Sequence, residues 1–510
     1  AEDAVELVRQ AGGGRIAETE AAEIAARAGG NPFFIVETTG MLLRPDGAPS
    51  LPQGQSLPPT VQAVVAARLD ALQPSLRDLA RRASVFLYSF GPRDLAPMSD
   101  GSVDDLRELE ESEILVRDEG VRSTPHWRFR HEMLRDVAYA SLPKRERQRL
   151  HELIAGDLLV AGRRSYAADH LERAAQASLD LDPGDRELPE RATDELAAAG
   201  DRARRRMESR SAIDYYERAL TMVGEQDRWG VREARVLAGM GEARYWLGEY
   251  PAATELLDRA VTLGSRLGDL WTLALAQRFL GDIAINVEAD LEKAQELLRR
   301  SLEAAEEIDE PWAIARTLLF AGWVPWTRDR YAEAETVWRR ALALAEAHDD
   351  RWSRVRALTS LSINGADMGN YDEATRLIDE ARALADEMGD QFSVAVTTVQ
   401  RGRLHHEQGL FEESIPCFDR GVSIFTELGA RWELGDALAA RGIAERELGR
   451  LDEAEADLRQ AVHISDELGE RQLAGWTWRA LASVAERRGD HAKAAERYRR
   501  AEEEDARRPR

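Results

Sequence analysis

Cysteine and lysine are nearly missing from this chain, and each absence excludes a kind of chemistry. The 510 residues include one cysteine, Cys417, so the chain can form neither an internal disulfide nor a cysteine cage for a metal. The phosphate loop of nucleotide hydrolases needs a glycine followed by a lysine that reaches the phosphates. The chain has three lysines, none of which follows a glycine: Lys144, Lys293 and Lys493. This chain therefore cannot hydrolyse ATP by that mechanism.

Long apolar runs and an excess of basic residues are also lacking. No apolar run approaches the ~20 residues that span a bilayer. Acidic residues outnumber basic ones by 93 to 69, and a surface with a net charge of −24 repels nucleic acid. The chain begins at Ala1 without a methionine, so we expect a fragment or a processed chain.

Catalytic motifs are missing as well. The sequence contains neither a Gly-x-Ser-x-Gly elbow nor a His-Glu-x-x-His zinc helix. His405-His406-Glu407 suggests a metal site, but adjacent histidines on a helix point about 100° apart, so a solvated helix face is the better interpretation. We expect no catalytic residue, no metal and no cofactor of its own in this chain.

A repeat is the feature that the chain does have. Small residues stand forty residues apart through its second half, and two earlier ones continue the series at a spacing of forty-one. The series is Ala212, Ala253, Ala294, Ala334, Ala374, Ser414, Ala454 and Ala494. A fixed period of this size predicts a stacked array of supersecondary units, whose long surface suits contacts better than catalysis.

The spacing within one unit predicts a helical hairpin. In the unit of Ala374, a large residue follows four positions later (Ile378) and a small one seven positions later (Ala381), all on one helix face. A further small residue, Ser362, precedes the anchor by twelve positions and belongs to the preceding helix. Gly369-Asn370-Tyr371 forms the turn between the two helices. Small residues let the helices approach closely, and the large one fills the gap.

This pattern resembles the tetratricopeptide repeat and covers about residues 189–510. The unit departs from the usual length of about 34 residues, since its period is 40, and it lacks the usual proline near the end of the second helix. Longer units look like the sensor arrays of MalT-like regulators. The resemblance implies an all-α, right-handed α-α superhelix whose concave face is lined by the first helices and binds a protein or a small-molecule effector.

An aromatic residue recurs with the same period near the start of each first helix. The series is Trp271, Trp312, Trp352, Phe392 and Trp432. A residue that recurs in every unit is typical of packing between repeats. An aromatic ladder for a ligand is the alternative.

The first 190 residues do not repeat. Residues 1–43 indicate short helices, and residues 44–59 indicate a Pro/Gly-rich linker. Residues 58–150 indicate three helices and a small hairpin, which together are typical of a winged helix, and residues 151–188 indicate a helical connector. The expected helices and strands are Val61–Leu72, Pro74–Phe86, Val103–Glu111, Ile114–Val116 and Trp127–Phe129.

Two motifs flank the expected winged helix. Gly29-Gly30-Asn31-Pro32-Phe33-Phe34 precedes it, and Arg130-His131-Glu132 begins the helix that follows it. With repeats after them, these motifs resemble the C-terminal half of a STAND-class signalling ATPase. That class includes MalT-like transcription activators, ATPase modules fused to nucleotide cyclases and, more distantly, NB-ARC proteins.

The resemblance implies nucleotide contacts for three residues. Residues 1–50 would be the helical lid, in which Gly30 and Pro32 pack on the adenine. His131 would contact the β-phosphate of ADP, although Arg130 stands where the family motif has methionine. A histidine at the start of a helix is also often structural, and that alternative stays open.

The same resemblance implies a function. The chain would be the regulatory and sensor half of a STAND-type ATPase, with ADP or ATP held only where a nucleotide-binding domain lies upstream of Ala1. Two alternatives are a stand-alone tetratricopeptide scaffold for protein–protein interaction and the non-catalytic part of a nucleotide cyclase or transcription activator. With the free Cys417, the resemblance favours the cytoplasm. Residues 58–150 hold 15 basic and 15 acidic residues, whereas DNA-reading modules present a basic face, so DNA binding is not expected.

Residues that break the repeat pattern on first helices are the best candidates for a partner site. They are Arg278, Arg316, Arg356, Arg401, Arg403, His405 and His406. Arginine recognises carboxylates and phosphates with a forked geometry, so these positions predict an acidic peptide or a phosphorylated small molecule as partner. The alternative is that the arginines pair with the abundant acids around them.

Overall fold

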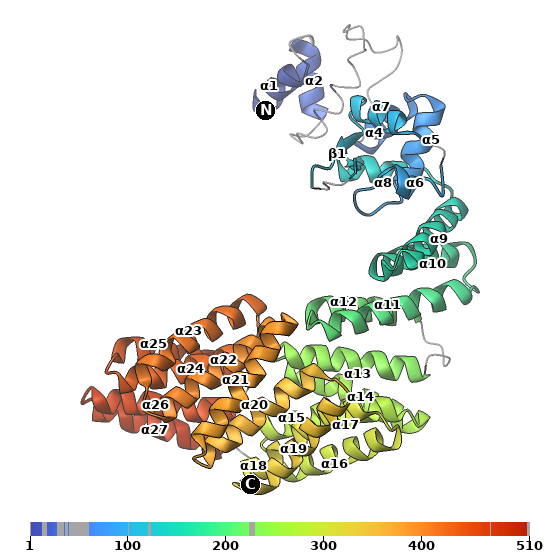
Figure 1. The fold of residues 1–510 in the computed structure, drawn as a ribbon. Helices are drawn as coiled ribbons and strands as arrows, with labels where there is room; N and C mark the ends of the chain where they lie inside the picture. Colours follow the sequence, from blue (N-terminus) through green and yellow to red (C-terminus); the bar gives the residue numbers. More distant parts are fainter. Residues whose placement is uncertain are drawn as a thin grey trace. The chain divides into compact units, whose positions relative to one another are not determined.

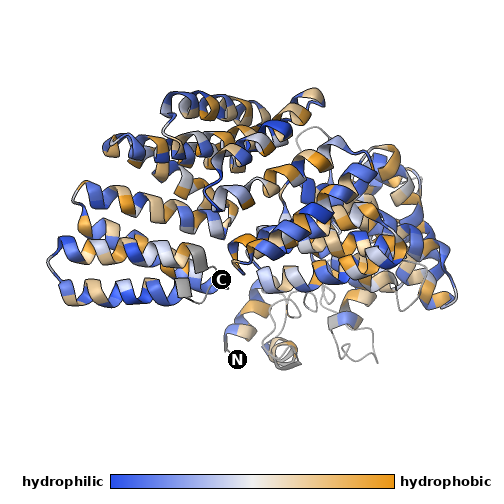
Figure 2. Ribbon diagram, turned by 90° about the horizontal axis from the view of Figure 1, so that it is seen from below, coloured by the Kyte–Doolittle hydropathy of each residue, from blue (hydrophilic) through white to orange (hydrophobic). Residues whose placement is uncertain are grey.

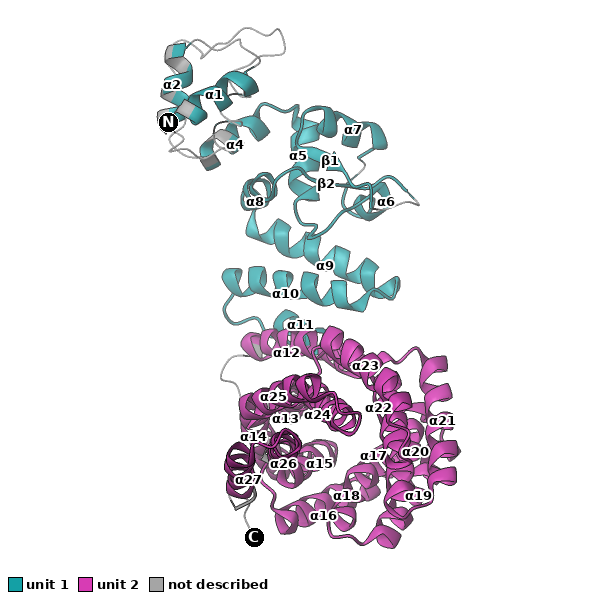
Figure 3. Ribbon diagram, turned by 90° about the vertical axis from the view of Figure 1, so that its left-hand side faces the viewer, with its two compact units in different colours: residues 1–196 teal, residues 197–510 magenta. Residues whose placement is uncertain are grey.

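The computed structural model describes residues 2–12, 18–27, 35, 39, 61–99, 101–120, 124–223, 230–469 and 471–506. The chain forms two compact units, residues 1–196 and 197–510 (Figure 3). The division falls inside one helix, α11 (Glu187–Arg205), close to where the repeats are expected to begin. Each unit has its own hydrophobic core.

Unit 1 contains short helices around a two-stranded antiparallel sheet. Val116 lies opposite Arg128 in that sheet. Its helices and strands are α1 (Glu2–Ala11), α2 (Glu18–Arg27), α4 (Val61–Asp70), α5 (Pro74–Ala83), α6 (Pro92–Leu95), α7 (Val103–Glu111), β1 (Leu115–Arg117), β2 (Trp127–Phe129), α8 (Glu132–Ala140), α9 (Lys144–Val160) and α10 (Arg164–Leu181).

Local chemistry explains where several of these elements begin. Ser102 accepts a hydrogen bond from the amide of Asp105, and the Asp105 carboxylate accepts one from the amide of Ser102, so a capping box starts α7. Pro74 stands in the first turn of α5, where its missing N–H does no harm.

Two of the predicted helices are shorter in the structure: α4 ends two residues earlier than predicted, and α5 ends three residues earlier. The assignment of this group as a winged helix stays a prediction.

Unit 2 is an all-α superhelical array of hairpins, which confirms the predicted fold class (Figure 1). Its helices carry both hydrophobic and hydrophilic residues, as expected of amphipathic helices (Figure 2). After α11 they are α12 (Ser209–Val223), α13 (Gly230–Trp246), α14 (Tyr250–Leu267), α15 (Leu270–Asn286), α16 (Leu291–Glu307), α17 (Pro311–Ala321), α18 (Trp323–Thr327), α19 (Tyr331–Ala347), α20 (Arg351–Asp367), α21 (Tyr371–Met388), α22 (Gln391–Glu407), α23 (Phe411–Leu428), α24 (Arg431–Glu447), α25 (Leu451–Leu468), α26 (Arg471–Arg487) and α27 (His491–Ala506).

The anchor residues of the repeat are buried between helices, as predicted. Ala374 is fully buried, and the eighth anchor, Ala494, is only 3% exposed. The large residue four positions after each anchor is also buried, except for Tyr498 in α27, which is half-buried. Tyr498 belongs to the last hairpin, which no later hairpin covers among the described residues.

Close approach of the helices depends on glycine. A Cβ atom added to Gly322 would lie 2.2 Å from Nε1 of Trp338, and one added to Gly241 would lie 2.7 Å from Leu257. Both contacts are far shorter than van der Waals distance. The glycine of the first helix and the large residue of the second therefore fit together only because glycine has no side chain.

Candidate functional site

The candidate site is a cavity of about 770 Å³ inside unit 2. Its wall comes mainly from the first helices of successive hairpins, namely α13, α15, α17, α18, α20, α22, α24 and α26. Figure 3 shows the helices of this unit arranged as a ring. Pockets that hold small organic ligands have volumes of roughly 300–1,000 Å³, so the cavity is large enough for one.

The cavity exists because early and late hairpins of the superhelix meet. The ring of Trp246, at the end of α13, lies edge-on to Phe392 of α22, with centroids 5.9 Å apart. Leu468, at the end of α25, packs on Gly248, where an added Cβ atom would lie 2.5 Å from Leu468 Cδ2. These contacts between distant hairpins turn an open groove into a cavity.

A break in one first helix supplies part of the aromatic wall. α17 ends at Ala321 and α18 begins at Trp323, and Pro325 has no N–H to donate to a carbonyl one turn earlier. The Trp323 ring lies 5.1 Å from that of Trp326, centroid to centroid. Rings that line the cavity also come from Tyr245, Trp246, Tyr250, Phe320, Tyr371, Phe418, Phe425, Trp432 and Trp476. Because Trp476 is 45% exposed, the cavity meets solvent beside α26.

Carboxyl groups stand among these rings. Asp282 accepts hydrogen bonds from the Tyr245 hydroxyl and from Asn286 Nδ2, the latter at 3.0 Å. Burial raises the pKa of Asp282 and holds the pKa of Tyr245 well above its usual range. Burial also raises the pKa of Glu433 to about 7, although its side chain is partly exposed. The positive charge of Arg356 lowers the pKa of Glu433, whereas the negative charges of Asp436 and Asp282 raise it.

Positive groups in the cavity are fewer than negative ones. Arg403 donates a hydrogen bond of 2.6 Å to Asp436, so that pair is neutral. Asp367 accepts a hydrogen bond of 2.8 Å from Trp326 Nε1, and burial raises its pKa. Five carboxyl groups line the cavity against two arginines and one histidine: Asp282, Asp367, Glu407, Glu433 and Asp436 against Arg356, Arg403 and His406. Burial lowers the pKa of His406, so this histidine does not restore the balance at neutral pH.

A second cluster in unit 2 has the opposite charge. Arg278 is 2% exposed, and its Nε has no hydrogen-bond partner among the described residues. Burial, with the positive charges of Arg316 and Arg204, lowers the pKa of Arg278 to about 9, and the negative charge of Glu242 opposes this shift. Arg204 itself is bound to Glu242 at 2.6 Å. Glu242 acts on all three guanidinium groups, and Asp350 Oδ2 lies 4.0 Å from Arg316 Nε.

The two clusters adjoin each other through one indole ring. The guanidinium carbon of Arg316 lies 4.7 Å from the ring centroid of Trp352, and that of Arg356 lies 5.8 Å from the same centroid. Arg316 also lies 5.4 Å from the Trp312 ring. Arg356 lines the cavity, so the buried arginine cluster adjoins the cavity wall at this arginine.

The residues predicted from sequence as a partner site divide into three groups. Arg356, Arg403 and His406 line the cavity, and Arg278 and Arg316 belong to the buried arginine cluster. Arg401 lies 3.3 Å from Asp379, and His405 Nδ1 lies 3.2 Å from the Glu413 carbonyl oxygen, so these two have local partners.

The residues predicted to contact nucleotide lie in unit 1 or outside the described part. Gly30 and Pro32 lie outside the described residues. His131 is described, is half-buried and is the N-cap residue of α8, with an extended backbone.

The recurring aromatic residues serve different purposes: some pack between helices, and one lines the cavity. Phe392 is buried and packs against Trp246 and Phe425. Trp432 lines the cavity, whereas Trp312 and Trp352 hold the Arg316 guanidinium.

Several cavity residues were not predicted from sequence. Asp282, Glu433 and the pair Trp323 and Trp326 all break the repeat pattern on first helices, as the predicted arginines do. A break in the repeat pattern therefore marks acidic and aromatic cavity residues as well as the arginines. Gly322-Trp323-Val324-Pro325-Trp326 is the clearest example, since proline interrupts a first helix between two tryptophans.

The described residues contain no group of three metal-ligating side chains. Within the same residues no helix is long and apolar enough to cross a membrane.

Comparison with known proteins supports the repeat and the fold. The tetratricopeptide repeat family model matches residues 393–467 and 433–503. No curated protein matches the chain. The crystal structure of a Signal Transduction ATPase with Numerous Domains (STAND) protein with a tetratricopeptide repeat sensor, from Pyrococcus horikoshii, is similar, with a TM-score of 0.56 and 16% identity over 99% of this chain and 72% of that one. A Rap protein complexed with competence and sporulation factor aligns with a TM-score of 0.47 and 12% identity, over 62% of this chain and 98% of that one.

Proposed function

We propose that this chain is the regulatory and sensor part of a STAND-type signalling ATPase, in which the repeat array binds an effector in its cavity. The observation that carries the proposal is the cavity of about 770 Å³, whose aromatic and charged lining includes residues that break the repeat pattern, such as Asp282, Glu433 and Trp323. Stacking alone requires residues that recur in every unit. Polar groups converging in an aromatic cavity are typical of a ligand site.

The buried arginine cluster supports an acidic group on that effector. Leaving the Nε of a buried guanidinium without an acceptor costs free energy, and a carboxylate or phosphate would supply the acceptor. Arg356, which lines the cavity, would contact this group, and the positive charges of Arg278 and Arg316 in the adjoining cluster would attract it. An acidic peptide or a phosphorylated small molecule fits these positions. Arg401, Arg403 and His405 would contribute only by exchanging their present partners.

The STAND assignment rests on two kinds of support. The motifs around Gly30, Pro32 and His131 resemble those of that class, and the fold of a STAND protein with a tetratricopeptide repeat sensor is similar over nearly the whole chain. His131 caps the N-terminus of α8, a position that suits contact with a phosphate. In this proposal unit 1 contacts a nucleotide-binding domain and unit 2 reads the effector.

A cavity-filling variant tests the effector site. Ala366 lines the cavity, whereas Ala332 is exposed on α19. We expect Ala366→Trp to reduce the affinity for sugar phosphates, dicarboxylates or acidic tripeptides at least tenfold, measured by calorimetry, and Ala332→Trp to leave it unchanged. Binding that is equal in both variants would place the ligand outside the cavity.

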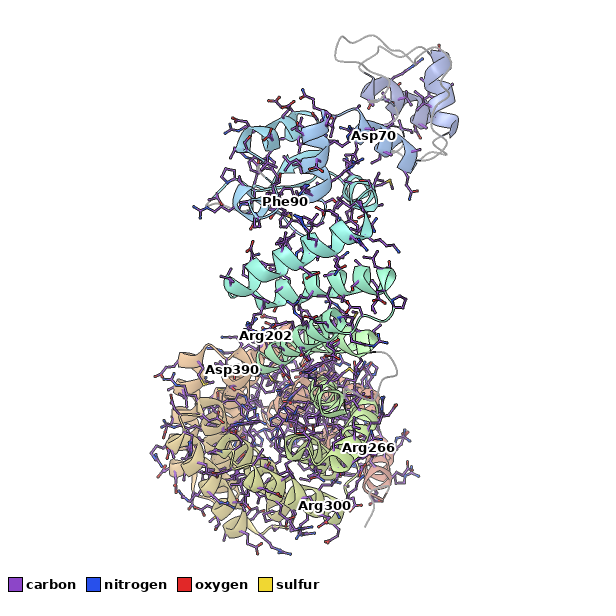
Figure 4. The ribbon with its side chains drawn as sticks, turned by 90° about the vertical axis from the view of Figure 1, so that its right-hand side faces the viewer. Asp70, Phe90, Arg202, Arg266, Arg300 and Asp390 are labelled. Atoms are coloured by element: carbon purple, nitrogen blue, oxygen red, sulfur yellow. The ribbon has the colours of Figure 1, made fainter. Side chains whose placement is uncertain are left out.

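A second pair of variants tests the acidic group. Arg278→Met removes the buried charge while keeping the apolar part of the side chain, so the fold should persist. Arg300, labelled in Figure 4, is an exposed arginine of α16 and provides the control Arg300→Met. We expect Arg278→Met alone to weaken binding of anionic ligands. Equal affinity in both variants contradicts the role of the arginine cluster.

A stand-alone scaffold for protein–protein interaction is the alternative, since tetratricopeptide repeats match residues 393–503. A scaffold would bind its partner on a surface outside the cavity, and Ala366→Trp would not affect that binding. The same pair of tryptophan variants therefore separates the two functions.

A further inference from the structure

The carboxyl groups that line the cavity outnumber its arginines, and an acidic group on the effector does not balance them. Arg403 is paired with Asp436, and Arg356 is the remaining arginine of the lining, facing both Asp282 and Glu433. The lining therefore carries more negative than positive groups even after pairing. An effector with acidic groups alone would leave these carboxyl groups without a counter-charge.

Buried carboxyl groups of this kind need either a proton or a cation. Removing an ionised carboxylate from water is costly unless a positive group compensates it. Asp282 has two hydrogen-bond donors, Tyr245 and Asn286, whereas the charges facing Glu433 are Arg356, Asp436 and Asp282. Two of those three are negative, so an ionised Glu433 needs a further positive group.

The surroundings of Glu433 suit an organic cation better than a metal ion. Trp432 precedes Glu433 on α24, and Trp323, Trp326 and Trp476 also line the cavity. Indole faces attract ammonium and guanidinium groups, and apolar rings accommodate the body that carries them. A metal ion prefers several oxygen ligands, but the described residues contain no such group.

We propose that the cavity recognises a positively charged group, an ammonium or guanidinium on an apolar body, between the Glu433 carboxylate and the tryptophan rings. This inference rests on the proposed function and deepens it, because the effector is then a zwitterion. Its anionic group lies at Arg356, next to the arginine cluster, and its cationic group lies at Glu433.

Three probes with the same body and different charges test the proposal on the full chain. They are 2-phenylethylamine, 2-phenylethanol and phenylacetate, which present an ammonium, a hydroxyl and a carboxylate next to one phenyl ring. Quenching of tryptophan fluorescence and calorimetry report binding, which for fragments of this size is roughly millimolar. We expect the amine to bind at least tenfold more tightly than the alcohol.

Glu433→Gln identifies the carboxyl group, with Glu303→Gln as control on the exposed face of α16. We expect Glu433→Gln to reduce amine binding about tenfold and to leave alcohol binding unchanged, and Glu303→Gln to change neither. Amine binding should also weaken as the pH falls through about 7, because Glu433 becomes protonated there, and Glu433→Gln should remove that step.

The outcomes separate this inference from the proposed function. Equal binding of amine and alcohol in the unaltered chain overturns the cation site, and so does an amine preference that Glu433→Gln leaves intact. Ala366→Trp should abolish binding of all three probes. If no probe shows binding that Ala366→Trp removes, the cavity is not a ligand site, and the proposed function falls with it. The comparison of amine with alcohol needs no variant, so a misfolded Glu433→Gln protein would not prevent the test.

Discussion

Single buried residues in unit 1 set its response to acid. His151 Nδ1 lies 2.8 Å from His170 Nδ1. The other ring nitrogen of each histidine lies near a tyrosine hydroxyl: His151 Nε2 is 3.0 Å from the Tyr139 hydroxyl, and His170 Nε2 is 3.3 Å from the Tyr88 hydroxyl. Burial lowers the pKa of His151 to about 2 and that of His170 to about 3. Both histidines are therefore neutral in the folded chain, and one ring of the pair donates to the other.

We predict that unit 1 loses stability as the pH falls below about 6.5. The unfolded chain binds a proton on each histidine near that pH, whereas the folded chain does not until pH 3 or below, so protonation favours unfolding. The free energy of unfolding should fall by up to about 1.4 kcal/mol per pH unit for each histidine. Hydrogen exchange of the α9 and α10 amides, followed by mass spectrometry from pH 7 to pH 4, measures this loss.

A double variant, His151→Gln with His170→Gln, provides the comparison. Glutamine does not titrate in this range, so the variant should show a shallower pH dependence together with lower stability at pH 7. An unchanged slope would mean that other groups cause the acid response.

At the scale of the element, the ends of the second helices differ between repeats. Gly389 ends α21 with a φ of 66°, and Gly429 and Gly469 end the next two second helices in the same left-handed conformation. The equivalent position after α19 is Asp349, with a φ of 51°. A left-handed backbone costs roughly 1–2 kcal/mol for a residue with a side chain, and less for aspartate.

We therefore predict opposite effects for a matched pair of substitutions. Asp349→Gly should raise the free energy of unfolding by up to about 1 kcal/mol, because it relieves backbone strain at an exposed site. Gly389→Asp should lower it by a similar amount. Urea denaturation of the two variants measures both changes, and a change of the same sign in both would contradict the explanation.

At the scale of the whole molecule, the chain divides into two units, of which unit 2 carries the cavity and unit 1 carries His131. In the proposed function, the nucleotide is held mainly by a separate domain with a phosphate loop. The sequence lacks that loop, because none of its three lysines follows a glycine.

We predict that this chain binds ADP and ATP weakly or not at all, as measured by calorimetry. A sub-micromolar dissociation constant for ADP would show that the phosphates are held by residues of this chain. In a protein that also carries the nucleotide-binding domain, His131→Ala should favour the open, ADP-free state, because one charge-assisted contact to the phosphate is lost. An unchanged rate of ADP release in that variant would favour a structural role for His131.

The sequence by itself determined the repeat, the burial of its anchors and the hairpin turns, because these depend on contacts between residues close along the chain. Ala374, Ile378 and Ala381 need only an adjacent helix to be buried, and their spacing specifies that helix. Only the tertiary structure decided where the cavity lies and which side chains enter it. Trp246 meets Phe392 across several hairpins, and that contact depends on small rotations that accumulate from one hairpin to the next. No spacing within one unit records those rotations, so Glu433 and Asp282 came together only once the superhelix had closed.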